Sequence, residues 1–162
     1  MKLAIIADTH LPRGARRLPD ECLRRLAATD LILHAGDFCT VAVLKELESL
    51  APVVGVIGNN DEPELAALLP ERRVVEVEGV RIGMVHDGGR RFGRNGRLVR
   101  LFPECAAVVY AHSHLAELAR EGRVWIVNPG SPTERRRSPA RSMVEAVAKR
   151  GEFRAQLVTF GP

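Results

Sequence analysis

Carboxylate, imidazole and amide side chains recur in this sequence directly after short apolar runs. The seven residues that share this placement are Asp8, His10, Asp37, Asn59, His86, His112 and His114. Neutral imidazoles and carboxylate or amide oxygens are donors that proteins use to hold divalent metal ions. The set therefore predicts a metal site, provided that the fold brings these distant segments together.

The apolar runs are typical of buried strands, because they are short and continuous rather than alternating. They cover residues 2–7, 31–35, 53–57, 80–85, 106–111 and 124–127. Between the early runs lie helical patterns at residues 20–28, 41–50 and 62–69. This βαβαβα order implies a parallel sheet with right-handed crossovers. Ligands of such sheets bind outside the carboxyl ends of the strands, where the polar residues fall.

The second half of the sequence predicts two antiparallel hairpins and one further helix. The hairpins pair residues 73–78 with 80–85 and 142–148 with 153–160, and the helix covers residues 95–101. We therefore predict an α/β fold, a four-layer α/β/β/α sandwich of two mixed β-sheets flanked by helices. The 162 residues suit one domain spanning 1–162, because a chain of this size buries a sufficient core without metal or disulfide support.

Several polar residues near these positions have simpler explanations. Asp61 is expected to cap the helix that follows it, and His34, inside a strand, is expected to be a hydrogen-bonded core histidine. Cys39 is expected to act as a small buried hydrophobe. Each of the seven candidate ligands, taken singly, could also cap or solvate a loop. Their coincidence at five strand ends favours a shared metal target.

Five short motifs resemble, in their order along the chain, those of the calcineurin-like metallophosphoesterase superfamily. They are Asp8-x-His10, Gly36-Asp37, Gly58-Asn59, the isolated His86 and His112-x-His114. The later segment Asn128-Pro129-Gly130-Ser131 resembles the small bacterial and archaeal phosphodiesterase branch, which is related to the retromer scaffold subunit. The fold of that family, a β-sandwich flanked by helices, agrees with the layers expected above.

The resemblance implies two divalent metal ions that share Asp37 as a bridging ligand. The first ion would be held by Asp8, His10 and His114, and the second by Asn59, His86 and His112. A metal-bridging hydroxide would attack phosphorus, so no side chain is assigned as the catalytic nucleophile. The implied activity is that of a phosphodiesterase acting on small or nucleotidic phosphate esters.

The donor set favours some metals over others. Imidazole suits Mn, Fe, Zn or Co better than Mg, which prefers carboxylates and water. We favour Mn(II), with Fe, Zn, Co, Ni and Mg as alternatives.

Asn60 departs from the pattern of the larger family, in which many members carry a histidine after the Gly-Asn motif. We expect Asn60 to bind substrate through its amide. An amide cannot act as a general acid, and such acids typically contribute about 10²–10⁴-fold. The sequence therefore predicts a preference for esters with good leaving groups and a modest turnover.

Charge and composition limit the partners. The net charge is +4, and the basic residues are almost all arginine, with two clusters at residues 90–100 and 135–141. Only Phe92 lies within either cluster to stack on a base, so we expect solvated faces and no nucleic-acid partner. No apolar run is long enough to span a membrane, and the 3 cysteines lack C-x-x-C spacing. These features predict reduced thiols, a cytoplasmic location and no membrane contact.

The sequence also allows a second function and self-association. One alternative function is a protein-binding scaffold on the same fold with weak or absent catalysis, as the relation to the retromer subunit suggests. The C-terminal hairpin also presents strands that would allow a homo-oligomer, although the sequence does not establish one.

Overall fold

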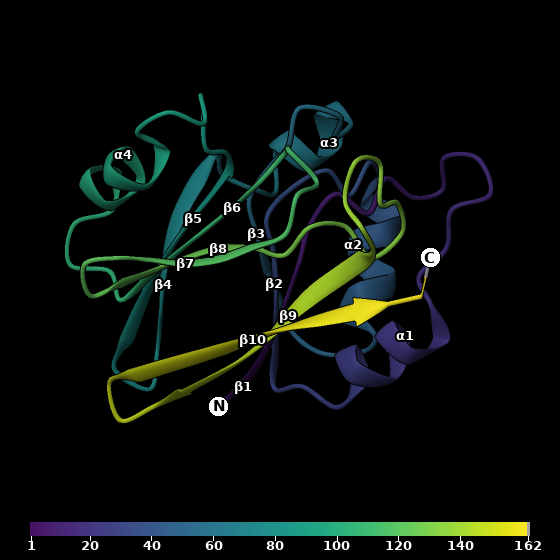
Figure 1. Ribbon diagram of the computed structural model, residues 1–162. Helices are drawn as coiled ribbons and strands as arrows, with labels where there is room; N and C mark the ends of the chain where they lie inside the picture. Colours follow the sequence, from purple (N-terminus) through teal and green to yellow (C-terminus); the bar gives the residue numbers. More distant parts are fainter. Residues whose placement is uncertain (162) are drawn as a thin grey trace.

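The computed structural model describes residues 1–161 and contains two five-stranded sheets stacked face to face (Figure 1). The first sheet has the order β10-β9-β1-β2-β3, with β1 (Lys2–Ile6), β2 (Leu31–His34), β3 (Val53–Gly55), β9 (Arg141–Lys149) and β10 (Glu152–Phe160). The second has the order β4-β5-β6-β8-β7, with β4 (Arg72–Val77), β5 (Val80–Asp87), β6 (Ala107–Ala111), β7 (Glu117–Glu121) and β8 (Val124–Asn128). Pro162, the last residue of the predicted domain, lies outside the described residues.

Both sheets are mixed, as predicted. Strands β1, β2 and β3 are parallel, and β9 joins β1 antiparallel. In the second sheet β5, β6 and β8 are parallel, while β4 and β7 are antiparallel to their neighbours. Both predicted hairpins, β4–β5 and β9–β10, are present.

Helices cover the outer faces of the sheets and complete the four layers. They are α1 (Asp20–Ala27), α2 (Val41–Glu48), α3 (Pro63–Ala66) and α4 (Arg94–Leu101). Leu26 of α1 and Leu44 of α2 belong to the core under the first sheet, and Leu98 of α4 to the core under the second. A third core fills the space between the sheets, where Ile5 and Ile82 are fully buried. Each such side chain stabilises the fold by about 1.5–3 kcal/mol.

The structure differs from the sequence prediction at two places, the third helix and strand β7. The third helix is shorter than expected, and its N-cap residue is Glu62 rather than Asp61, with Pro63 in the first turn. Strand β7 was not predicted at all, because its half-exposed sequence Glu-Leu-Ala-Arg-Glu has no apolar run. By contrast, the expected N-cap Thr40 accepts a hydrogen bond from the Val43 amide.

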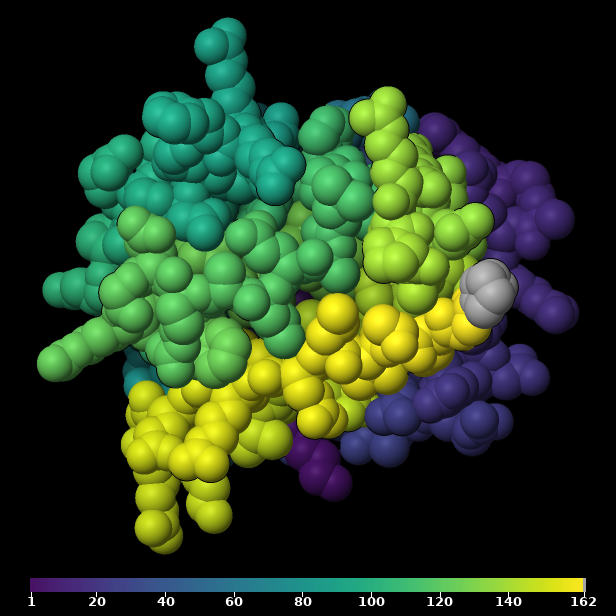
Figure 2. Space-filling view, viewed as in Figure 1, coloured from purple at the N-terminus to yellow at the C-terminus, as the bar shows by residue number. Residues whose placement is uncertain are grey.

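Strand β10 crosses one face of the molecule as an edge strand (Figure 2). Its nine residues pair only with β9 within residues 1–161, so the other edge of β10 is free to pair with a second copy of the chain. Within the same residues, no helix has both the length and the apolar character that a membrane crossing requires.

Candidate metal centre

The loops that leave the strands at the candidate site adopt unusual backbone conformations. Five of the predicted ligands have φ between 46° and 70°: Asp8, His10, Asp37, His112 and His114. Asp and His are enriched among the few non-glycine residues that tolerate the left-handed region. Such conformations cost about 1–3 kcal/mol each and cluster where a fold holds functional groups in place. The left-handed turns redirect these side chains from their strands to a common point.

Asp8, His10 and His114 form the inner group of the site. All three are buried, with at most 3% of their surface exposed. The Nε2 atoms of His10 and His114 lie 3.3 Å apart, and Asp8 Oδ1 lies 3.6 Å from His114 Nε2. One donor atom from each residue falls within 4.8 Å of the others. The structure therefore unites β1 with the loop after β6, more than a hundred residues away.

Asp37 lies between the inner group and the rest of the site. Its Oδ2 atom is 3.4 Å from His10 Nε2 and 3.5 Å from His86 Nε2. Asp8, Asp37 and His86 also form a second set of donors within 4.8 Å. A carboxylate in this central position can be shared by two cations.

Asn59, His86 and His112 form the outer group. Asn59 Oδ1 lies 2.9 Å from His86 Nε2 and 3.0 Å from His112 Nδ1. His86 is buried, whereas Asn59 and His112 are exposed. The structure therefore brings all seven predicted ligands to one place, with one group deep and the other open to solvent.

Several polar atoms of this site lack a hydrogen-bond partner or lie close to an acceptor, and a bound cation would stabilise them. His86 Nδ1 donates to the Ala35 carbonyl at 2.7 Å, so Nε2 is the ring nitrogen that faces the site. This Nε2 atom lies 2.9 Å from the Asn59 Oδ1 atom, which is an acceptor. Asp8 Oδ1 is buried with no hydrogen-bond partner among the described residues. The donor chemistry and these unsatisfied atoms fit divalent metal ions.

Burial sets the protonation of the inner group. It raises the pKa of Asp8 well above the ordinary value, and the nearby charge of Asp37 adds to this effect. Burial also lowers the pKa of His10, and it lowers that of His114 to about 4, with help from Arg136. Both rings are therefore neutral near pH 7, the form in which histidine binds metals.

Asp37 experiences opposing influences. Burial alone raises its pKa, but the neighbouring His86 and two hydrogen bonds from Asn60 lower it below the ordinary value. The Asn60 backbone amide donates to Oδ1 and the Asn60 side chain to Oδ2, both at 2.8 Å. The carboxylate is therefore held ionised and in a fixed orientation.

His34 supports the site from below, as the predicted hydrogen-bonded core histidine. The Gly36 amide donates to its Nδ1 atom at 3.2 Å, so its Nε2 atom carries the proton and donates to Thr9 Oγ1. Burial lowers the pKa of His34 to about 3. The neutral ring links the loop of Asp8 and His10 to the loop of Asp37.

Asp61 has a different role from the predicted helix cap. Its Oδ2 atom accepts hydrogen bonds from the amides of Gly58 (2.7 Å) and Asp37 (3.2 Å), and its Oδ1 atom from that of Cys39 (2.8 Å). The carboxylate therefore ties together the loops after β2 and β3. Local spacing suggested a cap, whereas two of the three backbone donors, the amides of Asp37 and Cys39, are more than 20 residues away.

Two glycines in the predicted motifs allow the loops to approach. A Cβ atom on Gly58 would lie 2.2 Å from Asp37 Oδ1, and one on Gly36 would lie 2.7 Å from His86 Nδ1. The Gly-Asp and Gly-Asn motifs thus need glycine for close packing against a ligand.

The segment Asn128–Ser131 supports the ligand loops without contributing to the ligand set. Asn128 Nδ2 donates to Ser113 Oγ, between the two histidines of the last motif. Ser131 Oγ donates to the Asp8 carbonyl at 2.8 Å. These contacts fix the backbone on either side of the inner group.

Cys39 is buried beside the site, as expected for a small hydrophobe, and its Sγ atom lies 3.8 Å from His10 Nδ1. The cysteines of the described residues are free thiols.

The arginine cluster near α4 mainly stabilises its own loop. Arg94 donates to the Gly89 carbonyl and to the Tyr110 hydroxyl, and Arg97 donates to the carbonyls of Arg90 and Phe92. The side chain of Phe92 is 95% exposed. This arrangement agrees with the predicted solvated face.

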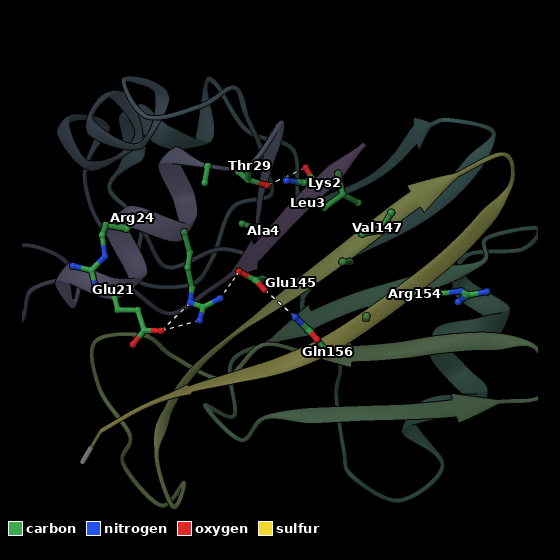
Figure 3. Close-up of a pocket in the computed structure, with 14 residues that line it drawn as sticks. Lys2, Leu3, Ala4, Glu21, Arg24, Thr29, Glu145, Val147, Arg154 and Gln156 are labelled. Atoms are coloured by element: carbon green, nitrogen blue, oxygen red, sulfur yellow. Dashed lines mark hydrogen bonds and ion pairs between the residues drawn. The ribbon is translucent and has the colours of Figure 1, made fainter.

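A groove of about 640 Å³ lies apart from the metal centre. It is formed by α1, β1, β9 and β10, and none of the predicted metal ligands lines it. In its centre Glu145 accepts hydrogen bonds from Arg25 and Gln156, while Arg24 and Arg154 lie at its margins (Figure 3).

The sequence matches a known family over nearly its whole length. Residues 1–150 match the calcineurin-like phosphoesterase superfamily domain. The chain belongs to this superfamily. The motifs that suggested the resemblance lie within the matched range, and the site they form has the metal-binding character of these phosphoesterases.

Individual proteins are similar to this chain in sequence or in structure. A probable metallophosphoesterase of Methanothermobacter thermautotrophicus is 35% identical over 135 residues, covering 82% of this chain and 78% of the relative. A phosphodiesterase of Methanocaldococcus jannaschii is 25% identical over 150 residues, covering 80% and 83%. The structure is also similar to that of Entamoeba histolytica Vps29 complexed with zinc, with a TM-score of 0.78, 24% identity, and coverage of 99% of this chain and all of that one. The last similarity supports the predicted fold.

Proposed function

We propose that this chain is a phosphodiesterase that uses two divalent metal ions to hydrolyse small or nucleotidic phosphate esters. The observation that carries the proposal is the position of Asp37, whose Oδ2 atom lies within 3.5 Å of histidines from both groups. The phosphodiesterase name of the relative from M. jannaschii supports the same substrate class. The free thiols of the described residues support the further proposal that the enzyme is cytoplasmic.

In this proposal, different side chains bind the metal ions and the substrate. The inner group, with Asp37, would hold one ion, and the outer group, with Asp37, the other. Bound divalent ions supply Lewis acidity, which activates water and offsets charge on phosphate. Mn(II) is the favoured ion, with Fe, Zn, Co, Ni and Mg as alternatives. The mixture of four imidazoles with oxygen donors suits a transition metal better than Mg.

Asn60 orients Asp37 and is proposed to contact substrate. One N–H of its amide donates to Asp37, and its oxygen accepts from Arg13. A primary amide has two N–H groups, so one stays available for a phosphate oxygen. Because an amide cannot protonate a leaving group, rates should depend steeply on leaving-group pKa. A flat dependence across a graded series of aryl and alkyl diesters would contradict this part of the proposal.

The test is hydrolysis of bis-p-nitrophenyl phosphate with and without Mn(II), in wild type and Asp37→Asn. We expect metal-dependent turnover that falls at least 100-fold in the variant. Asp20→Asn, on the exposed start of α1, makes the same charge change away from the site and should retain full activity.

The alternative function is a protein-binding scaffold, supported by the fold similarity to Vps29. The absence of turnover with every one of the candidate metals would favour it over the phosphodiesterase. Full turnover in Asp37→Asn would instead refute the bridging role of this carboxylate.

A further inference from the structure

One arginine reaches from one ligand loop of the metal centre to another. Arg13 stands three residues after His10, and its Nη1 atom donates to Asn60 Oδ1 at 3.4 Å. Asn60 in turn donates to Asp37 Oδ2 at 2.8 Å. The guanidinium is therefore two hydrogen bonds away from the central carboxylate.

The backbone of Arg13 is fixed on the loop that carries it. Its amide donates to the His10 carbonyl at 3.0 Å, and its own carbonyl accepts from the Arg16 amide and guanidinium. Arg16 is anchored in turn by an ion pair of 2.9 Å with Glu134, which also binds Arg136. The loop is thus tied to the ligand segment at one end and to the loop after β8 at the other.

The charge of Arg13 is not neutralised by a carboxylate in the described part of the chain, whereas Glu134 neutralises Arg16 and Arg136. A guanidinium carries five N–H donors, and the contact with Asn60 uses one of them. The side chain is exposed, so the remaining donors are open to a molecule at the metal centre. Their planar arrangement suits two oxygens of a phosphate.

We propose that Arg13 binds the phosphate group of the substrate, beside the free N–H of Asn60. This inference rests on the proposed function for the identity of the ester, and it adds a specificity residue outside the metal ligands. Arg13 cannot give up a proton at physiological pH. It acts by pairing with the negative charge of the phosphate, so phosphate affinity should depend on it even where no bond is broken.

The experiment measures binding of inorganic phosphate to the Mn(II)-loaded protein by calorimetry, after the metal content of each variant has been determined. In Arg13→Gln the dissociation constant should rise about 10- to 100-fold, as expected for the loss of a hydrogen bond to a charged group. Arg13→Lys should recover part of the affinity, because it keeps the charge but not the paired donors. The matched control is Arg17→Gln, an exposed arginine of the same loop without a contact to the site, which should bind phosphate within about twofold of wild type.

Equal phosphate affinity in Arg13→Gln and Arg17→Gln would overturn the inference, as would loss of metal from Arg13→Gln or a wild type that binds no phosphate. Hydrolysis of bis-p-nitrophenyl phosphate separates this result from the proposed function. Phosphate binding through Arg13 without any hydrolysis would refute the phosphodiesterase and support Arg13. Hydrolysis that persists while both variants bind phosphate equally would refute Arg13 alone.

Discussion

The inner and outer groups of the metal centre share Asp37 but differ in burial and charge. The inner group has a buried carboxylate, Asp8, whose Oδ1 atom has no hydrogen-bond partner among the described residues. In the outer group, the oxygen ligand that corresponds to Asp8 is the neutral amide of Asn59, and this residue is exposed. A cation in the inner group would compensate a buried charge, whereas one in the outer group would replace water. We therefore expect the inner group to bind its ion more tightly.

The largest expected effect is on metal affinity. It comes from two single substitutions, each of which removes a histidine from one of the two groups. His114→Ala should lower the affinity for the more tightly bound ion more than about 100-fold, because it removes a ligand from the buried group. His112→Ala should affect only the weaker ion and leave one tightly bound equivalent. Titration of both variants with Mn(II) by calorimetry checks the difference. If both variants lose the same equivalent, the two groups are not separate sites.

Gly58→Ala should disturb Asp37 and therefore both groups at once. The new methyl group would lie 2.2 Å from Asp37 Oδ1, so the carboxylate must move. We expect metal affinity to fall about 10- to 100-fold, as for other changes that displace a ligand without removing it. Gly161→Ala, where a Cβ meets nothing within 4 Å, is the control in the same titration. An unchanged affinity in Gly58→Ala would show that the approach of the two loops does not position Asp37.

Asp61→Asn should weaken the link between the loops of the central and outer ligands. An amide in place of the carboxylate leaves at least one of the three backbone donors without an acceptor. We expect the free energy of unfolding to fall by about 1–3 kcal/mol, measured by urea denaturation. Asp20→Asn should change it by less than about 0.5 kcal/mol. Equal stabilities of the two variants would contradict the loop-tying role.

The smallest effect concerns pH and the histidine beneath the site. The folded protein keeps His34 neutral down to its lowered pKa of about 3, whereas an unfolded histidine takes up a proton below about pH 6.5. The unfolded state therefore binds more protons between these values, and stability is lost as the pH falls through this window. His34→Gln should lack this contribution of up to about 1.4 kcal/mol per pH unit.

Urea denaturation of chelator-treated wild type and His34→Gln between pH 4 and 7 measures the difference. Parallel profiles for the two proteins would contradict a neutral His34 in the folded state.

The sequence predicted those parts of the molecule that depend on regular strands. Apolar runs located the buried strands, and strand direction placed Asp8 and Asp37 at one edge. The edge strand β7 lacked such a run and was missed. Asp61 was assigned to a local cap because two of its three partners, the amides of Asp37 and Cys39, lie in another loop, and sequence spacing does not reveal contacts of that kind.

The contact of Arg13 with Asn60 was equally hidden, because it joins two irregular loops 47 residues apart. The left-handed conformations of the ligands were hidden as well. They arise because the assembled loops impose them on residues that would avoid them in isolation.

We propose that the seven side chains would hold a pair of divalent ions that share Asp37. Electron paramagnetic resonance of the protein loaded with Mn(II) tests it most directly. We expect two ions per chain with magnetic coupling between them, and loss of that coupling in Asp37→Asn. Retention of no divalent ion, or of two ions without coupling in the wild-type protein, would contradict it.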